Sequence, residues 1–99
     1  MPKIYEYFGF VLFFYSNEHA PIHVHVKKQD RESVFEIIMQ DGILKEVRLR
    51  PNKKNPLSNK EIAETKRFVE IFANKITQKW INYFVYNKVV RCGKISKKV

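Results

Sequence analysis

The chain of 99 residues is poor in the residues that define several classes of protein. Cys92 is its one cysteine, so an internal disulfide is excluded and a reducing, cytoplasmic compartment is expected. Three glycines and four prolines exclude collagen-like and low-complexity chains. The longest apolar run, residues 8–15, is far shorter than the roughly 20 residues that span a bilayer. These shortages indicate one small globular domain without a membrane span.

Acidic side chains are missing from Ile71 to the last residue, a stretch with seven Lys or Arg. Residues 1–46 hold five basic and seven acidic side chains, whereas residues 47–99 hold fourteen basic and three acidic, a balance of +11. A surface of one sign attracts polyanions. We therefore expect RNA or an acidic cognate protein as partner, against the alternative that the lysines only keep the surface solvated. Self-association into a homo-oligomer stays open.

The first half of the chain is rich in aromatic and branched residues typical of strands. Gly9 separates the first two apolar stretches, which predicts either a hairpin or one strand with a bulge. A later stretch alternates with period two, so that His23, His25 and Lys27 share one face. The strands are predicted over residues 4–8, 10–15, 23–27, 33–39 and 43–49.

The last two of these strands flank Asp41 and Gly42 and are predicted to form a hairpin. A two-residue loop would set Glu36 opposite Val47. A three-residue loop, with Gly42 left-handed at its end, would set Phe35 opposite Val47. The second register groups apolar with apolar side chains, and we prefer it.

A capping box predicts where the helical part begins, because Ser58 and Glu61 can each satisfy a backbone N–H at a helix start. Apolar residues then recur at helical spacing as far as Phe84, which predicts one long helix or two helices broken near Asn74. The fold class is therefore α+β, with a small antiparallel sheet packed against one long or two consecutive C-terminal helices. Residues 1–86 are expected to form the domain, and residues 87–99 a basic, partly mobile extension.

Two stretches resemble a small bacterial family of domains of unknown function, the one numbered four-one-six-zero. They are Phe-Tyr-Ser-Asn-Glu-His at residues 14–19 and Pro-Ile-His-Val-His-Val at residues 21–26, and Trp80 shortly before Tyr83 and Phe84 is similar as well. The resemblance covers residues 1–86. It implies an α+β fold, a cytoplasmic bacterial protein and a place in a two-gene module of the toxin–antitoxin type. It implies no established activity.

Three histidines lie within seven residues, at His19, His23 and His25. Imidazoles that share a strand face could act as base and acid on an RNA 2′-hydroxyl and its leaving oxygen, which defines a tentative catalytic set of these three. The negative charge of the phosphorane intermediate could be stabilised by Lys27, Arg48 or Arg50.

Two other interpretations of the histidines remain. No metal or other cofactor is expected, but if a metal binds, its ligands would be the three histidines and Glu18. Alternatively the histidines are hydrogen-bonding parts of the fold, with Asn17 and Glu18 positioning the loop.

The function predicted from these features is RNA or acidic-partner binding within a two-gene module, in its sharpest form a ribonuclease-type toxin. A non-enzymatic protein-interaction module and a metal-binding regulator are the alternatives, so enzymatic activity stays open. The open face of the sheet is expected to hold His23, His25 and Lys27 near the loop that follows Arg48. The nucleic-acid-binding residues predicted are Lys27, Lys28, Arg48, Arg50, Lys53, Lys54, Lys75, Lys79 and Arg91.

Overall fold

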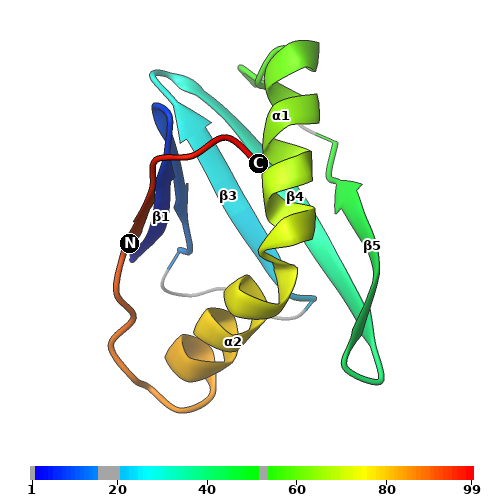
Figure 1. Ribbon diagram of the computed structural model, residues 1–99, viewed down its shortest axis with the longest axis vertical. Coiled ribbons are helices and arrows are strands. Elements are labelled where there is room, and N and C mark those ends of the chain that lie inside the picture. The colour runs from blue at the N-terminus through cyan, green and yellow to red at the C-terminus, as the bar shows by residue number, and fades with distance from the viewer. Residues whose placement is uncertain (1, 16–20, 52–53) are drawn as a thin grey trace.

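The computed structural model describes residues 2–15, 21–51 and 54–99 and consists of one sheet with two helices on one of its faces (Figure 1). The strands lie in the order β5-β4-β3-β2-β1-β6. Neighbours are antiparallel except β1 and β6, which are parallel. The expected α+β class is thus confirmed. The elements are β1 (Lys3–Tyr7), β2 (Phe10–Phe13), β3 (His23–Lys28), β4 (Arg31–Gln40), β5 (Ile43–Leu49), α1 (Asn59–Ile71), α2 (Ala73–Phe84) and β6 (Gly93–Ile95).

Two tight turns set the registers of the hairpins. Phe8 and Gly9 both have positive φ, 46° and 85°, as a two-residue hairpin turn requires. Asp41 and Gly42 repeat this conformation with φ of 54° and 77°, so the expected three-residue loop is wrong. A bulge beside Met39 then shifts the register.

The shifted register explains how apolar residues still face one another across the β4–β5 hairpin. Gln40 pairs with Ile43 at the turn, but beyond the bulge Ile37 lies opposite Val47. Val47 and Ile37 are both buried in the core. The bulge therefore pairs Val47 with Ile37 instead of the expected Phe35, and apolar residues still face one another.

The core lies between the sheet and the helices. Phe68 of α1 is fully buried, and its ring centroid lies 4.4 Å from that of Tyr7 and 4.3 Å from that of Phe72. Tyr5 packs edge-on against the same two phenylalanines. Burial of one such ring stabilises the fold by roughly 1.5–3 kcal/mol relative to its exposed state.

The predicted capping box is present at the start of α1. The Ser58 side chain accepts from the Glu61 N–H, and the Glu61 carboxylate accepts from the Ser58 N–H at 2.9 Å. The helical part is broken in two at Phe72, whose φ and ψ are −97° and 11°. This break comes two residues before the predicted one at Asn74.

Residues 87–99, expected to be a basic extension, include the short strand β6. Gly93 pairs with Tyr5 and Ile95 with Tyr7, which adds β6 to the free edge of β1. Beyond β6 the Val99 N–H donates to the Tyr7 hydroxyl at 3.3 Å. Mobility elsewhere in this extension stays a prediction. Across the described part of the chain, no helix has the length and apolar character needed to cross a membrane.

Candidate functional site

The histidine pair of β3 lies on the face of the sheet opposite the helices. Val24 and Val26 alternate with the histidines and belong to the core beneath the helices. Both imidazoles are nevertheless buried, with exposed fractions of 4% for His23 and 7% for His25. Side chains of the open face therefore cover them.

His25 is held by groups from the two neighbouring strands, β2 and β4, and from the residue Tyr15 that follows β2. Its Nδ1 lies 3.1 Å from Oε2 of Glu32, which accepts the hydrogen bond. The Tyr15 hydroxyl also donates to this carboxylate, at 3.4 Å. The imidazole packs against the rings of Phe13 and Tyr15, at centroid distances of 5.3 and 4.5 Å.

Sequence reasoning missed Glu32 as a partner of the histidines. The sequence did contain a signal for it. A tight turn that pairs Lys28 with Arg31 also pairs Lys27 with Glu32, and Lys27 is the next residue after His25 on the same face of β3. Tyr15 follows β2 and reaches the cluster from the other side. Neither contact follows from the spacing of the histidines alone.

His23 contacts the backbone of the chain that leads into β3. Its Nδ1 lies 2.7 Å from the Pro21 carbonyl oxygen, and its ring centroid lies 5.4 Å from that of His25. These contacts favour the interpretation of the histidines as parts of the fold. In residues 2–15, 21–51 and 54–99, no group of three or more His, Cys, Asp or Glu could hold a metal ion. Four predicted site residues lie outside the described residues: Asn17, Glu18, His19 and Lys53.

A pocket of about 370 Å³ adjoins the histidine cluster. Tyr15 and Glu32 line it on one side, and Lys54 and Asn55 line it on the side of the chain that leads to α1. Asp30 also belongs to its wall, so two carboxylates and one ammonium group surround the opening. The pocket thus places a carboxylate–imidazole pair beside a cation, without an excess of positive charge.

The predicted basic residues of the open face are largely matched by carboxylates. Arg50 donates to Glu36 from two nitrogens, at 2.9 and 3.0 Å, and Arg48 donates to Glu46 at 3.0 Å. The alternation of β4 and β5 interleaves these acids with the arginines. Lys27 is exposed on the same face as the histidines.

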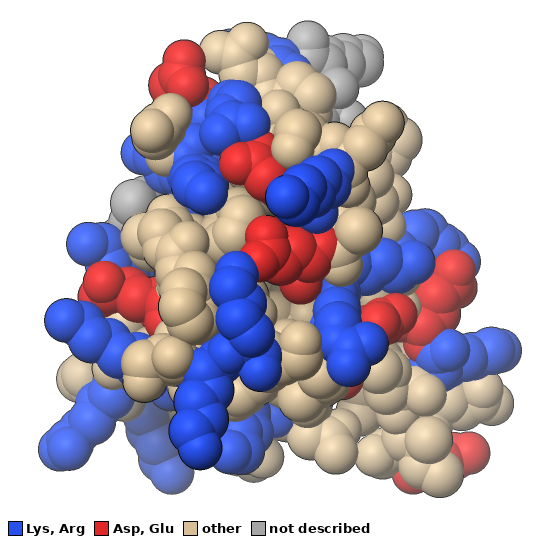
Figure 2. All heavy atoms as spheres, turned by 45° about the horizontal axis from the view of Figure 1, so that its top comes forward, with Lys and Arg blue, Asp and Glu red and all other residues tan. Residues whose placement is uncertain are grey.

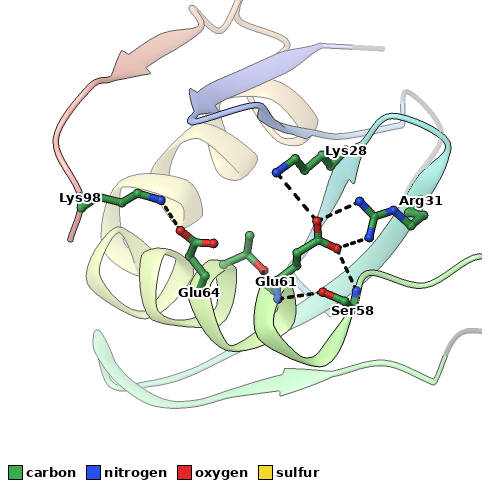
Figure 3. A network of polar contacts seen from close by, with 7 residues as sticks. Lys28, Arg31, Ser58, Glu61, Glu64 and Lys98 are labelled. Atoms are coloured by element: carbon green, nitrogen blue, oxygen red, sulfur yellow. Dashed lines mark hydrogen bonds and ion pairs between the residues drawn. The ribbon is translucent and has the colours of Figure 1, made fainter.

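Lys28 points to the helix-covered face, where Glu61 is the centre of a polar network (Figure 3). Lys28 Nζ lies 3.8 Å from the Glu61 carboxylate, and Arg31 donates to both carboxylate oxygens. The Ser58 backbone N–H, together with Arg31, lowers the pKa of Glu61. The network fixes the start of α1 to the turn between β3 and β4, which indicates a structural role for Lys28.

Three further predicted cations, Lys75, Lys79 and Arg91, lie on α2 and the segment that follows it. We define the basic surface as these three together with Lys88, which the sequence analysis did not select. Lys75 and Lys79 are one helical turn apart, and Lys79 Nζ donates to the Arg91 carbonyl oxygen at 2.6 Å. Among the described residues no carboxylate forms an ion pair with any of the four. In Figure 2 acidic side chains accompany the basic ones at the top and right, whereas the charged side chains at the lower left are almost all Lys or Arg.

Exposed aromatic surface accompanies these charges. Tyr86 is 60% exposed, and Lys88 Nζ lies 5.4 Å from its ring centroid. Lys79 Nζ lies 5.0 Å from the ring centroid of Tyr5, which is buried in the core. The predicted cations thus fall into different regions: Arg48 and Arg50 are paired with carboxylates on the open face, Lys28 belongs to the Glu61 network, and Lys75, Lys79 and Arg91 of the basic surface form no ion pair with a described carboxylate.

Comparisons with known proteins give one match. The model of the family described as Domain of unknown function (DUF4160) matches residues 9–81. No curated protein and no solved structure matches the chain. The matched part includes the histidine pair and most of α2, and it ends before Lys88 and Arg91. Since the match spans more than half of the chain, the protein belongs to the family Domain of unknown function (DUF4160).

Proposed function

We propose that this protein binds RNA through the basic surface. The observation that supports this proposal is the set of four cations on α2 and the following segment, none of which is paired with a described carboxylate. From Ile71 onward the sequence also contains no Asp or Glu. A surface with uncompensated positive charge gains free energy when phosphates displace its counterions.

The aromatic surface beside the charges favours RNA over an acidic protein. Tyr86 is exposed within reach of Lys88, so a base could stack on the ring while the ammonium group binds a phosphate. An acidic peptide would use the charges but would leave the ring without a planar partner. Binding of a small acidic protein is therefore the alternative that the experiment must separate.

The resemblance described above suggests the setting in which RNA binding would act. A component of a two-gene toxin–antitoxin-like module needs either a target or a cognate partner, and the basic surface supplies a site for an RNA target. This assignment goes beyond the family, which has no assigned activity.

The test compares two variants with the same net charge. One replaces Lys75, Lys88 and Arg91 with Gln, and the matched control replaces Lys45, Lys60 and Lys66 with Gln. RNA affinity is measured by fluorescence anisotropy over a series of salt concentrations. Three lost phosphate contacts reduce the slope of log K against log salt by about 2 for single strands. The first variant should show this reduction and the control should not.

Two outcomes contradict the proposal. Equal losses in both variants would show that total charge, rather than this surface, governs binding. Copurification of a small acidic cognate protein at physiological salt, without nucleic acid and with no measurable RNA affinity, would assign the surface to a protein partner.

RNA cleavage at the histidine cluster is a second candidate function. The hydrogen bond from His25 to Glu32 favours it, because a carboxylate orients an imidazole for proton transfer. A ribonuclease assay would compare the wild-type protein with His23→Ala and His25→Ala, with Lys45→Gln as control. Cleavage that depends on both histidines supports the candidate, and equal activity in all four proteins refutes it.

A further inference from the structure

A second pocket opens where α2 ends, next to the basic surface. Its volume is about 420 Å³, within the range of roughly 300–1,000 Å³ that small-molecule sites occupy. The last turn of α2 supplies one wall and the segment after it supplies the other. The residues that line it include Pro2, Tyr83, Phe84, Lys88, Val89 and Val90.

Backbone hydrogen bonds hold the pocket in shape. After α2 the N–H groups of Val85 and Tyr86 both donate to the Ile81 carbonyl, at 2.9 and 3.2 Å. Asn87 then adopts a positive φ of 53°, which turns the chain back. The Lys88 N–H donates to the Asn82 carbonyl at 2.8 Å and closes the turn. The second wall is therefore fixed to the helix before any ligand arrives.

The aromatic wall is supported from behind. The Phe84 ring lies 4.8 Å from those of both Tyr83 and Trp80, and 5.7 Å from that of Phe14. Phe14 and Trp80 are buried in the core. Tyr83 and Phe84 are only partly buried, so part of each ring faces the pocket.

The pocket combines flat apolar walls with positive charge. None of its lining residues is acidic, Lys88 lies at its edge, and Tyr83 follows Lys79 by one helical turn on α2. A planar apolar group with a phosphate attached matches this arrangement. A nucleobase in a polynucleotide has that chemistry, whereas an acidic side chain lacks the planar apolar part.

We infer that the pocket holds one unpaired base of a single-stranded RNA, stacked on Tyr83, with the flanking phosphates on Lys88 and Arg91. This inference rests on the proposed RNA binding and adds the substrate class. A base within a duplex is stacked and paired and cannot enter a recessed pocket, so only unstacked bases fit. Proteins that bind single strands combine cations and aromatic rings in the same way.

The experiment measures the affinity for a 5′-labelled single-stranded 12-mer of mixed sequence and for a 12-base-pair RNA duplex. The duplex has the higher charge density, so charge alone favours it. We expect the single strand to bind at least about fivefold more tightly, since one stacked base contributes roughly 5- to 150-fold in affinity. Tyr83→Ala should remove this preference and leave duplex affinity within about twofold.

Three controls make the outcome specific. Tyr83→Phe keeps the ring and should keep the preference, which also shows that position 83 tolerates substitution. Phe8→Ala removes an exposed ring at the turn between β1 and β2, outside the pocket, and should keep the preference too. Adenosine 5′-monophosphate, titrated against the fluorescence of Trp80, tests a free nucleotide as ligand, because Trp80 contacts the pocket wall through Phe84.

The outcomes separate this inference from the proposed function. Salt-dependent binding without single-strand preference, or a preference that survives in Tyr83→Ala, overturns the base pocket alone. Adenosine monophosphate binding as tightly as the 12-mer reassigns the pocket to a free nucleotide and overturns the inference. Absence of binding to either RNA overturns both the pocket and the basic surface as an RNA site.

Discussion

Substitution of Gly93 by Ala should detach β6 from the sheet without changing any charge. A methyl group at this position would lie 2.9 Å from Cε1 and 3.0 Å from Cδ1 of Tyr5, closer than carbon atoms approach without a clash. The ring of Tyr5 cannot move aside easily, because Phe68 and Phe72 pack against it edge-on at 5.6 and 5.3 Å. The strand, held by three paired residues, is the part that yields.

The magnitude follows from the cost of adding a methyl group to a packed site, about 1–3 kcal/mol. If β6 detaches, the clash is relieved, so the loss cannot exceed the free energy that residues 93–99 contribute by packing against β1. For a domain of about 100 residues each kcal/mol lowers Tm by roughly 4–8 °C. We therefore expect a measurable fall in Tm, together with loss of hydrogen-exchange protection at the backbone amides of β6.

The assay combines thermal unfolding with native-state hydrogen exchange. Ser96→Ala is the matched control, since Ser96 is exposed and lies just beyond the paired residues. In a Tyr5→Leu background the clash disappears, so Gly93→Ala should cost less there than in the wild type. A Gly93→Ala protein with unchanged Tm and protected β6 amides would refute the packing argument.

Three further predictions concern the turn, the core and the first turn of α1. Gly42→Ala should lower the free energy of unfolding by about 1–2 kcal/mol in a urea titration, because φ at this position is 77°, a left-handed conformation that alanine adopts only with strain. An added methyl group would meet no other atom within 4 Å, so this backbone strain is the whole cost. Phe68→Ala should cost about 3–5 kcal/mol in the same titration, and a loss below 1 kcal/mol would contradict its place in the aromatic core. The pKa of Glu61 is lowered, so its carboxylate stabilises the fold at neutral pH and this contribution is lost as pH falls through the folded-state pKa. Glu61→Gln should flatten the acid side of the plot of Tm against pH, and an unchanged profile would contradict the role of the network.

Local sequence patterns predicted the elements that depend on local interactions. The capping box located the start of α1, because both of its hydrogen bonds join residues three apart. The period-two pattern assigned His23 and His25 to one face of β3, and the structure has them there. Such features need no knowledge of what lies elsewhere in the fold.

Features that depend on distant residues were not predictable in this way. The register of β5 depends on a bulge beside Met39, which allows Val47 to lie in the core. No local sequence pattern indicates where the core lies. The parallel pairing of β6 with β1 joins opposite ends of the chain. The separation of the predicted cations of β5 from those of α2 also follows from tertiary structure, since α2 and β5 belong to different layers (Figure 1).

The parallel partnership of β1 and β6 has a consequence for the order of assembly during synthesis. Tyr7 and its hydrogen-bond partner Val99 are 92 positions apart, so β1 emerges from the ribosome long before its outer neighbour is made. Until then the nascent chain presents a strand edge with open N–H and C=O groups, which is prone to intermolecular association. Neither β1 nor β6 belongs to the stretch shared with the family, residues 9–81. The edge of β1 and the strand β6 that shields it are therefore both additions to the shared part.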